Sequence, residues 1–488
     1  MMRRVLCRGA GVLGATLLAA CASVNQSPPA VATADPATLG ARSVTVDWPK
    51  EDWWKRYGDA QLDTLIDEGL SGSPTLAAAR ARIARADAAA GIARSALFPQ
   101  VTGTAASTYQ RFPENYIWPP PFAGNWQTDN RLELDFSYEI DFWNKNGAAL
   151  DAALSQVQAA AADAQAARVL LTTSIARAYF NLQRLHAQRD VSRAAIVQRD
   201  DVVRLTAQRF AAGLDTRVEV RQAEAALATV RTELAQYDEQ VVIARNQLAA
   251  LIGAGSDRGA AIVAVQPTTG PSSAPPAAVP LDLLGRRPDI VASRWRVEAA
   301  RHDAEVARAL FYPNVNIVAF LGMSSIGLSK LLQTGSTAAG VGPAIHLPIF
   351  EGGRLNANLR GRNADVDIAV TAYNEAVIAG VRDVADALAS IAGNAHVTAE
   401  QARARKATTD AYNIAVIRYK AGLGNYLSVL TAQTQQLVQD RLDADLTARA
   451  FELDVNLARA LGGGFVDSPP PSDAPPSRVS AATPAATH

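Results

Sequence analysis

One segment of the chain alternates between apolar and polar residues without interruption. This is RLELDFSYEIDF, residues 131–142. The apolar positions are Leu132, Leu134, Phe136, Tyr138, Ile140 and Phe142. The polar positions are Arg131, Glu133, Asp135, Ser137, Glu139 and Asp141. A period of two predicts a β-strand with one apolar face and one polar face. Its length suits a tilted strand that crosses a bilayer, and the edge of a sheet on a soluble core shows the same alternation.

Three further strands are predicted around this one. Residues 99–112 form its expected hairpin partner, with an exposed loop between the two strands, and residues 313–322 and 338–350 repeat the arrangement. In lipid, an open sheet of four strands leaves backbone groups unpaired, and closed barrels begin at about eight strands. If the strands span a membrane, several chains must share one barrel, with eight strands in a dimer or twelve in a trimer.

Long helices account for most of the rest of the chain. Residues 148–212 contain neither Gly nor Pro, and a continuous helix of that length would extend about 98 Å. Residues 214–252 also lack both, and their apolar residues recur at steps of three and four, which predicts a coiled coil. At the matching positions of a later helix stand Gln436, Gln439 and Asp443, so we expect that face to meet water.

A short word centred on glycine interrupts the helical pattern twice. RFAAGL occupies residues 209–214, and RYKAGL occupies residues 418–423. Because glycine adopts left-handed backbone angles at little steric cost, Gly213 and Gly422 are predicted to be the tips of two helical hairpins. A contact or a gate at these tips is compatible with the turn and is a functional hypothesis added to it.

The chain contains two copies of one unit. The segment ending at Pro99 resembles the segment ending at Pro313, LAALIG (248–253) resembles LARALG (457–462), and the two glycine words lie at the same relative place. The predicted fold is mainly α, with two tandem repeats that each carry two strands and a long coiled-coil hairpin. The expected divisions are 1–20 signal peptide, 21–47 tether, 48–265 first repeat with hairpin 147–253, 266–280 Pro-rich linker, 281–463 second repeat with hairpin 352–462, and 464–488 disordered tail.

The N-terminus has the layout of a secretory signal peptide. A basic start is followed by an apolar run that ends in LAAC, residues 18–21. LAAC resembles the bacterial lipobox, which implies cleavage before Cys21 and attachment of lipid to its sulfur. The alternative is an ordinary signal peptide that contains a cysteine.

Charge and side-chain chemistry argue against other classes. The chain has 47 basic and 47 acidic residues, so nothing favours binding to nucleic acid. Its five histidines show no metal-ligand spacing, and there is no nucleophile elbow or P-loop. We therefore expect no enzymatic activity and no cofactor.

Several motifs together resemble the TolC-like outer-membrane efflux proteins, in the lipoprotein branch called the NodT family. The resemblance covers about residues 48–463. It is carried by WWKRYGDAQLDTLIDEGL, the strand entries FPQV and YPNV, LPIFEGGRLNANL, RYKAGLGNYLSVLTAQ and LARALGGG.

This resemblance implies a homotrimer in the outer membrane. Twelve strands would form one barrel, and twelve helices would continue it as a tunnel across the periplasm. The trimer would be the exit duct of an inner-membrane pump, usually driven by protons and joined through a periplasmic adaptor. Its cargo would be small molecules such as drugs. Two alternatives are a type I protein-secretion duct and a lipid-anchored helical scaffold without a pore, for which the acidic face of strand 131–142 has no purpose.

The predicted site residues fall into two groups beside the lipidated Cys21. The strand is expected to face a wet pore with Glu133, Asp135, Glu139 and Asp141. The periplasmic aperture and adaptor contact are expected at Arg209, Gly213, Asp215, Arg418, Tyr419, Lys420, Gly422, Tyr426, Ser428 and Thr431. Tyr419 and Lys420 match the tip residues of relatives, and Tyr419 and Tyr426 are expected to add aromatic surface. Ser428 and Thr431 stand where relatives often carry acidic residues, which argues against an acidic ring.

Overall fold

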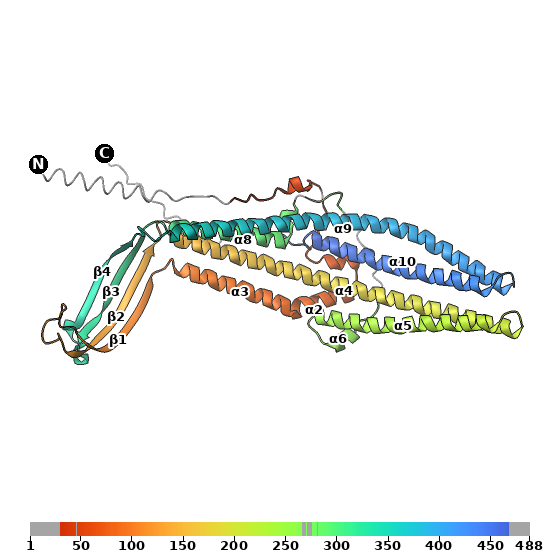
Figure 1. Cartoon of the computed structure of the whole chain (residues 1–488), viewed down its shortest axis with the longest axis horizontal. Helices are drawn as coiled ribbons and strands as arrows, with labels where there is room; N and C mark the ends of the chain where they lie inside the picture. The colour runs from red at the N-terminus through yellow and green to blue at the C-terminus, as the bar shows by residue number, and fades with distance from the viewer. Residues whose placement is uncertain (1–29, 45, 266–269, 271–275, 281, 468–488) are drawn as a thin grey trace.

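The computed structural model describes residues 30–44, 46–265, 270, 276–280 and 282–467. The molecule is elongated, with a β-sheet at one end and two helical hairpins that run to the other (Figure 1). Cys21 and its signal peptide lie outside the described residues.

Both repeats have the same order of elements, as predicted. The first consists of α3 (Pro74–Ser95), β1 (Gln100–Arg111), β2 (Trp126–Ile140), α4 (Lys145–Ala211) and α5 (Arg217–Leu251). The second consists of α8 (Pro288–Ala309), β3 (Asn314–Ile326), β4 (Thr337–His346), α9 (Arg354–Lys420) and α10 (Tyr426–Ala460). Matching helices agree in length, with 67 residues in α4 and α9 and 35 in α5 and α10.

Short elements connect and brace these repeats. They are η1 (Pro36–Leu39), η2 (Trp53–Tyr57), α2 (Ala60–Gly72), α6 (Ser256–Ala260), α7 (Leu283–Arg286), η3 (Leu328–Lys330) and η4 (Thr334–Ser336). None of the helices in the described chain combines the length and the apolar character that a membrane-spanning helix needs.

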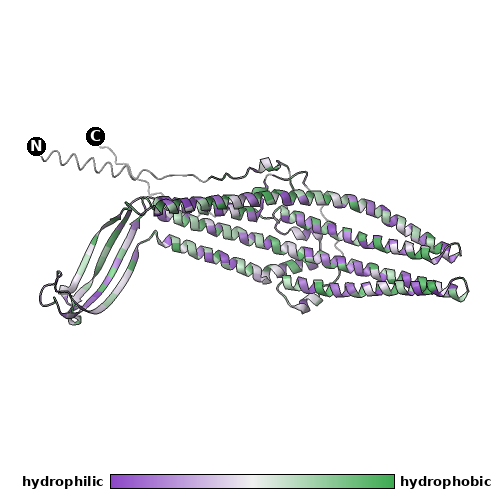
Figure 2. Cartoon of the chain, in the orientation of Figure 1, coloured by the Kyte–Doolittle hydropathy of each residue, from purple (hydrophilic) through white to green (hydrophobic). Residues whose placement is uncertain are grey.

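The four strands form one antiparallel sheet in the order β1-β2-β3-β4, so β2 and β3 join the two repeats. Leu134 lies opposite Gly103 and Leu321, while Glu133 lies opposite Thr104 and Gly322. Facing partners share a face of the sheet, so the apolar row continues across these three strands. Figure 2 shows the mixture of hydrophobic and hydrophilic residues along the strands. The outer edges, β1 and β4, have no neighbouring strand within the described chain.

The strand bounds differ from the predicted ones by two or more residues at four ends, one of which is the end of β3 at Ile326 instead of residue 322. β2 begins at Trp126 and ends at Ile140, and β4 ends at His346 instead of residue 350. Pro348 stands two residues after the end of β4, and a proline has no N–H to continue a ladder. Pro343 lies within β4, which is an edge strand of the sheet in a single chain.

A buried core at the middle of the molecule joins η2 and α2 to the helices of both repeats. Here Tyr57 is fully buried, and its hydroxyl donates to Asp454 Oδ2 at 2.7 Å. Arg56 forms an ion pair with the same carboxylate at 2.6 Å. Burial, followed by the charge of Asp454, raises the pKa of Tyr57 above its usual value.

The contact between the two helices is apolar in the first hairpin and polar in the second. The α4–α5 hairpin includes a buried apolar row from α5, as the sequence predicts: Ala223, Leu227, Val230, Val241, Ala244 and Leu248. The expectation that the Gln436–Asp443 face of α10 meets water is wrong. Arg405 of α9 reaches across to Asp440 and Asp443 at 2.8 Å each, and Gln436 is buried. This seam is a polar contact between helices.

The described residues nearest to each terminus are more closely attached to the helices than predicted. The tail was expected to be disordered from residue 464, but Phe465 packs against α8 residues and Asp467 pairs with Arg294 at 2.6 Å. Residues 468–488 lie outside the described chain. The part of the tether that the structure describes, from Ala30 onward, lies along α9 and is not a free linker.

Candidate functional site

The two glycine words form the reversals at the far end of the hairpins, which confirms the predicted turns. Gly213 and Gly422 have φ of 73° and 75°. In each turn the following leucine closes the helix end, with Leu214 N–H donating to Arg209 O at 2.9 Å and Leu423 N–H donating to Arg418 O at 2.8 Å. A bond of this span with a left-handed glycine is the Schellman arrangement.

A network of side chains links the first tip to the second. Arg209 Nε donates to Asp215 Oδ2 at 3.0 Å, and Arg209 Nη1 donates to the backbone oxygen of Tyr419 at 3.0 Å. The Arg209 guanidinium lies 4.5 Å from the centre of the Tyr419 ring, and the Tyr419 hydroxyl donates to Asp215. One carboxylate on the first hairpin therefore receives bonds from both hairpins.

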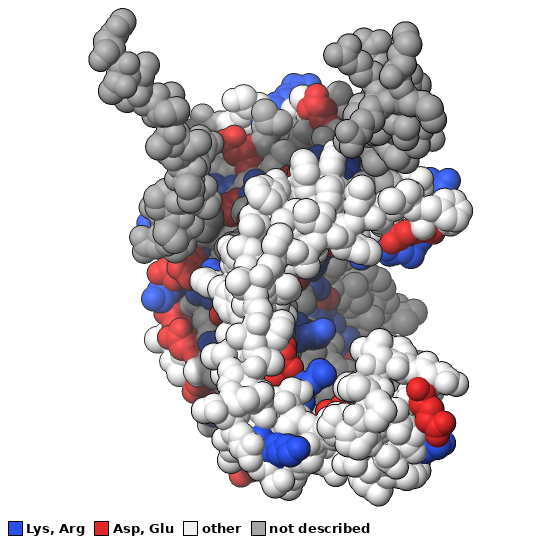
Figure 3. All heavy atoms as spheres, turned by 90° about the vertical axis from the view of Figure 1, so that its left-hand side faces the viewer, with Lys and Arg blue, Asp and Glu red and all other residues white. Residues whose placement is uncertain are grey.

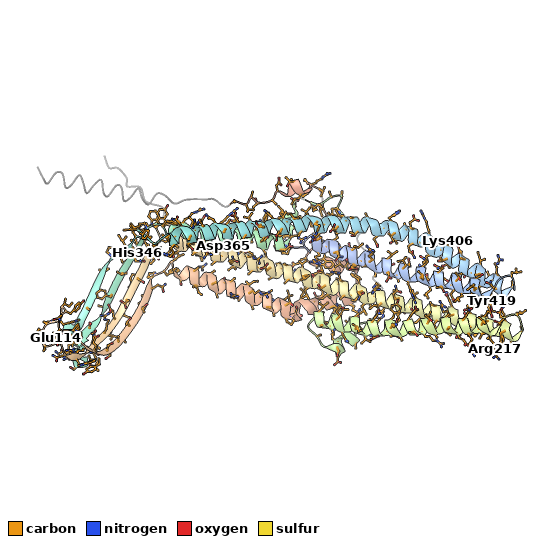
Figure 4. All side chains as sticks on the ribbon, viewed as in Figure 1. Glu114, Arg217, His346, Asp365, Lys406 and Tyr419 are labelled. Carbon is orange, nitrogen blue, oxygen red and sulfur yellow. The ribbon has the colours of Figure 1, made fainter. Side chains whose placement is uncertain are left out.

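Tyr419 and Tyr426 are buried and do not form the exposed aromatic surface expected from the sequence. Tyr419 is fully buried and Tyr426 nearly so, in a cluster with Val202, Ala223 and Val429. The two hairpins pack against each other here, so the rings fill the space between them. Burial, followed by the bond to Asp215, raises the pKa of Tyr419, which keeps its hydroxyl a donor. Figure 4 shows Tyr419 near the tip of the second hairpin and Arg217 near the tip of the first.

The two tips differ in charge. The place of Asp215 is taken in the second repeat by Gly424, 209 residues later, and Arg418 donates only to the Leu423 backbone oxygen at 3.3 Å. Within the part of the chain that the structure describes, Arg418 and Lys420 are exposed and form no ion pair. The second tip therefore presents positive charge that its own residues leave unneutralised.

Both tips also expose aliphatic side chains at matching positions. Leu214 and Leu423 are 64% and 71% exposed, and Val218 and Leu427 are similarly exposed. Ser428 and Thr431 are exposed on the first turns of α10, where Asn425 caps the helix by accepting from Ser428 N–H at 3.0 Å. The sequence did not single out these aliphatic residues, although their repetition at an offset of 209 was a signal that could have identified them.

The acidic residues of the strand lie at the opposite end of the molecule. Glu133 contacts Arg131 at 3.7 Å, Thr104 donates to Asp135 at 3.4 Å, and Glu139 pairs with Lys145 at 2.5 Å. The face that carries Glu133, Asp135 and Glu139 therefore holds charges of both signs. Seen from the sheet end, Figure 3 shows scattered basic and acidic residues among uncharged ones.

Asp141 was predicted to face a pore as part of the strand, but the strand ends one residue before it. The chain leaves the sheet at Ile140, and the Asp141 carboxylate accepts from the backbone N–H groups of Lys145 at 2.6 Å and Gly147 at 2.8 Å. A carboxylate at a helix N-terminus satisfies donors that the helix itself leaves free. Asp141 therefore fixes the start of α4.

An aromatic pair lies at the junction of the sheet and the helices. Trp143 and Tyr312 stack with ring centres 4.5 Å apart, and Trp143 Nε1 donates to Pro313 O at 2.9 Å. Phe98 and Phe350 are exposed at the same junction. Among the described residues, no group of His, Cys, Asp or Glu is arranged to hold a metal ion.

Comparisons with known proteins agree on one family. The model of the outer membrane efflux proteins matches residues 65–254 and 279–463. The chain is 38% identical to the fusaric acid resistance protein FusA of Burkholderia cepacia over 362 residues, which cover 72% of this chain and 68% of that protein. It is 31% identical to the multidrug resistance outer membrane protein MdtP of Escherichia coli K12 over 494 residues, or 96% and 98% of the two chains.

The outer membrane protein VceC of Vibrio cholerae shares the fold, with a TM-score of 0.81 and 39% identity over 86% of this chain and 100% of that one. The tandem repeats, the small sheet and the long hairpins are thus those of TolC-like channels. The chain belongs to the outer membrane efflux protein family and is an outer-membrane exit duct that extends into the periplasm.

Proposed function

We propose that three copies of this chain form the exit duct of a tripartite pump, joined through a periplasmic adaptor to an inner-membrane transporter. The observation that carries this proposal is the sheet with two open edges, β1 and β4. In hydrocarbon, an open edge leaves backbone groups without partners, which costs several kcal/mol for each group. Joining β4 of one copy to β1 of the next closes a barrel, and three copies give twelve strands.

The cargo we propose is small toxic molecules such as drugs. Its support is the pair of relatives whose names refer to resistance, to fusaric acid in one case and to many drugs in the other. Conduction through a duct breaks no bond, so we propose no catalytic role for any residue. A type I protein-secretion duct is the alternative with the same architecture.

The tips are the proposed closed aperture and adaptor contact. The bonds among Arg209, Asp215 and Tyr419 tie the two hairpins together where the tunnel would end. Exposed Leu214 and Leu423 give each tip an apolar contact surface, which interfaces favour at their centre. With Ser428 and Thr431 in place of acidic residues, closure depends on packing and hydrogen bonds more than on a charged ring.

Crosslinking and conductance test this function together. Purified protein treated with a short crosslinker is expected to give a trimer band, and the same sample is expected to conduct ions across a planar lipid bilayer. A monomer that does not conduct would overturn the proposal and favour the scaffold alternative.

Cysteine substitutions along β2 are expected to label in alternation. Residues 133, 135 and 139 should react with a water-soluble thiol reagent, while residues 134, 136 and 138 should be protected, because lipid covers one face and water the other. The measurement is the labelled fraction in outer-membrane vesicles. Equal labelling on both faces, or none on either, would contradict a membrane-spanning strand with a wet face.

Cys21 is expected to carry lipid in the mature protein. Mass spectrometry of the N-terminal peptide should show cleavage before Cys21 and an added acyl mass, because LAAC ends the apolar run of the signal. Each buried CH₂ contributes about 0.8 kcal/mol to membrane attachment. Cys21→Ser should abolish the modification while trimers still insert through their barrel. An unmodified N-terminus in the wild-type protein would contradict lipidation.

A further inference from the structure

An extended N-terminal segment lies along the side of α9. Figure 1 shows it beside the helix, before the short turn η1. Ala30 N–H and Val31 N–H both donate to Asp367 Oδ1, at 2.9 and 3.0 Å. One step further on, Ala34 N–H donates to Asn374 Oδ1 at 2.7 Å, and Asn374 Nδ2 donates to Ala32 O at 3.0 Å. These contacts fix five consecutive residues of the chain against α9.

The two α9 side chains suit an extended backbone. A carboxylate only accepts, and Asp367 receives two adjacent backbone donors in charge-assisted bonds. An amide donates and accepts, so Asn374 pairs with the segment as a neighbouring strand would. Seven residues separate them, which is two helical turns or about 10 Å on one face. The four steps from Ala30 to Ala34 span about 13 Å when extended, so the spacings match.

The segment is also held at its other end. Arg42 N–H donates to Val279 O at 2.9 Å in a bridge beside the second repeat. Val46 and Trp48 pack against the cluster that contains Val384 of α9 and Leu457 of α10. The segment thus follows α9 from the middle of the molecule toward the sheet.

We propose that Asp367 and Asn374 form a docking site on α9 for the lipidated N-terminal segment. We also propose that this site sets the distance from the membrane at which the segment leaves the surface of α9. The inference rests on the proposed function, in which the sheet spans the outer membrane and Cys21 carries lipid. The docked face of α9 then belongs to the outside of the tunnel, since the segment covers it.

The length of chain before the docking site supports this role. Thirteen helical residues separate Asp367 from Arg354, the start of α9 beside the sheet, which is about 20 Å. Nine residue steps separate Cys21 from Ala30, and nine extended residues reach at most about 30 Å. The acyl group can therefore reach the sheet end while the segment stays docked, with only a few residues to spare.

Shortening the tether is the decisive experiment. A nitroxide is attached to a cysteine at Thr33, which is exposed, and its mobility is measured by electron paramagnetic resonance on full-length trimers in lipid bilayers. At natural length we expect an immobilised spectrum. Deletion of residues 24–29 leaves three steps, about 10 Å, which cannot span about 20 Å. Because lipid insertion is stronger than four hydrogen bonds of which three are exposed, the deletion should release the segment and give a mobile spectrum.

Two further variants show whether the shortened segment is released because the lipid pulls on it or because the deletion itself disrupts docking. Replacing residues 24–29 by six Gly and Ser residues keeps the length and should keep the segment docked. Combining the deletion with Cys21→Ser, behind a signal peptide that needs no lipid, should restore the immobilised spectrum, because nothing then pulls on the segment.

Substitutions on α9 test the docking residues themselves. Asp367→Ala with Asn374→Ala should release the segment at natural length. Asp365→Ala, which removes only the exposed pair with Arg362, should not release it. Figure 4 marks Asp365 on this stretch of α9.

A mobile spectrum at natural length overturns the docking site. An immobilised spectrum in the shortened chain, with acylation verified by mass spectrometry, overturns the length-setting role. Bilayer conductance of the same samples tests the duct separately, so loss of conductance with an unchanged spectral pattern would contradict the proposed function and leave the docking site standing.

Discussion

Gly462→Ala is expected to prevent accumulation of the folded protein. Gly462 has φ of 91°, and a Cβ at this position would lie 1.8 Å from the backbone oxygen of Arg286. Left-handed backbone in a residue other than glycine costs about 1–3 kcal/mol, and overpacking a tight contact costs about as much again. A sum of about 2–6 kcal/mol is a large part of the stability of an ordinary domain.

The position explains why the surroundings cannot relax cheaply. Gly462 follows α10 and packs against the backbone just before α8, where Arg287 pairs with Asp289 at 2.6 Å and with Asp383 at 3.2 Å. Gly464, two residues on, would place its own Cβ 2.2 Å from Lys50 O. The end of the second repeat therefore packs tightly against the backbone at Arg286 and at Lys50.

The measurement is the amount of trimer in the outer-membrane fraction, with the apparent Tm of any purified protein. Gly393→Ala is the matched control, because this glycine is inside α9 and its Cβ would meet nothing within 4 Å. There the change should raise helix stability by about 0.5–1 kcal/mol. Wild-type levels and Tm for Gly462→Ala would show that the Arg286 segment moves aside easily.

The order of strands, long helices and hairpin tips could be predicted from the sequence because each signal was periodic or repeated. Alternation identified β2, the absence of Gly and Pro identified α4, and a glycine word at an offset of 209 identified both tips. These signals depend only on a residue and its near neighbours in the chain.

Predictions that depended on a partner from a distant segment failed. The polar residues of α10 suggested water because Arg405, which satisfies Asp440 and Asp443, is on another helix. Tyr419 was assigned to the surface because Asp215, its hydrogen-bond partner, is 204 residues away. The N-terminal segment resembled a free tether because Asp367 and Asn374 lie more than 330 residues away from it.

Tyr419→Phe is expected to open the proposed periplasmic aperture while leaving the fold intact. The change removes one hydroxyl from a buried ring and keeps the ring beside Val202 and Val429. It deletes the bond to Asp215, which is the side-chain tie from the second hairpin to the first hairpin's carboxylate. A hydrogen bond to a charged group contributes about 1.5–3 kcal/mol, so each protomer's closed state should lose roughly tenfold to a hundredfold in relative population.

Single-channel conductance of purified trimers in a planar bilayer measures this directly, and the open fraction is expected to rise at unchanged trimer yield. Tyr426→Phe is the matched control, because Tyr426 is buried in the same cluster, and in the described chain its hydroxyl does not bond across the tips. Asp215→Asn should act like Tyr419→Phe, since a neutral amide weakens the bonds from both Arg209 and Tyr419. If Tyr419→Phe and Asp215→Asn conduct like Tyr426→Phe and the wild-type protein, the network only shapes the turns. Closure would then have to come from another part of the tunnel.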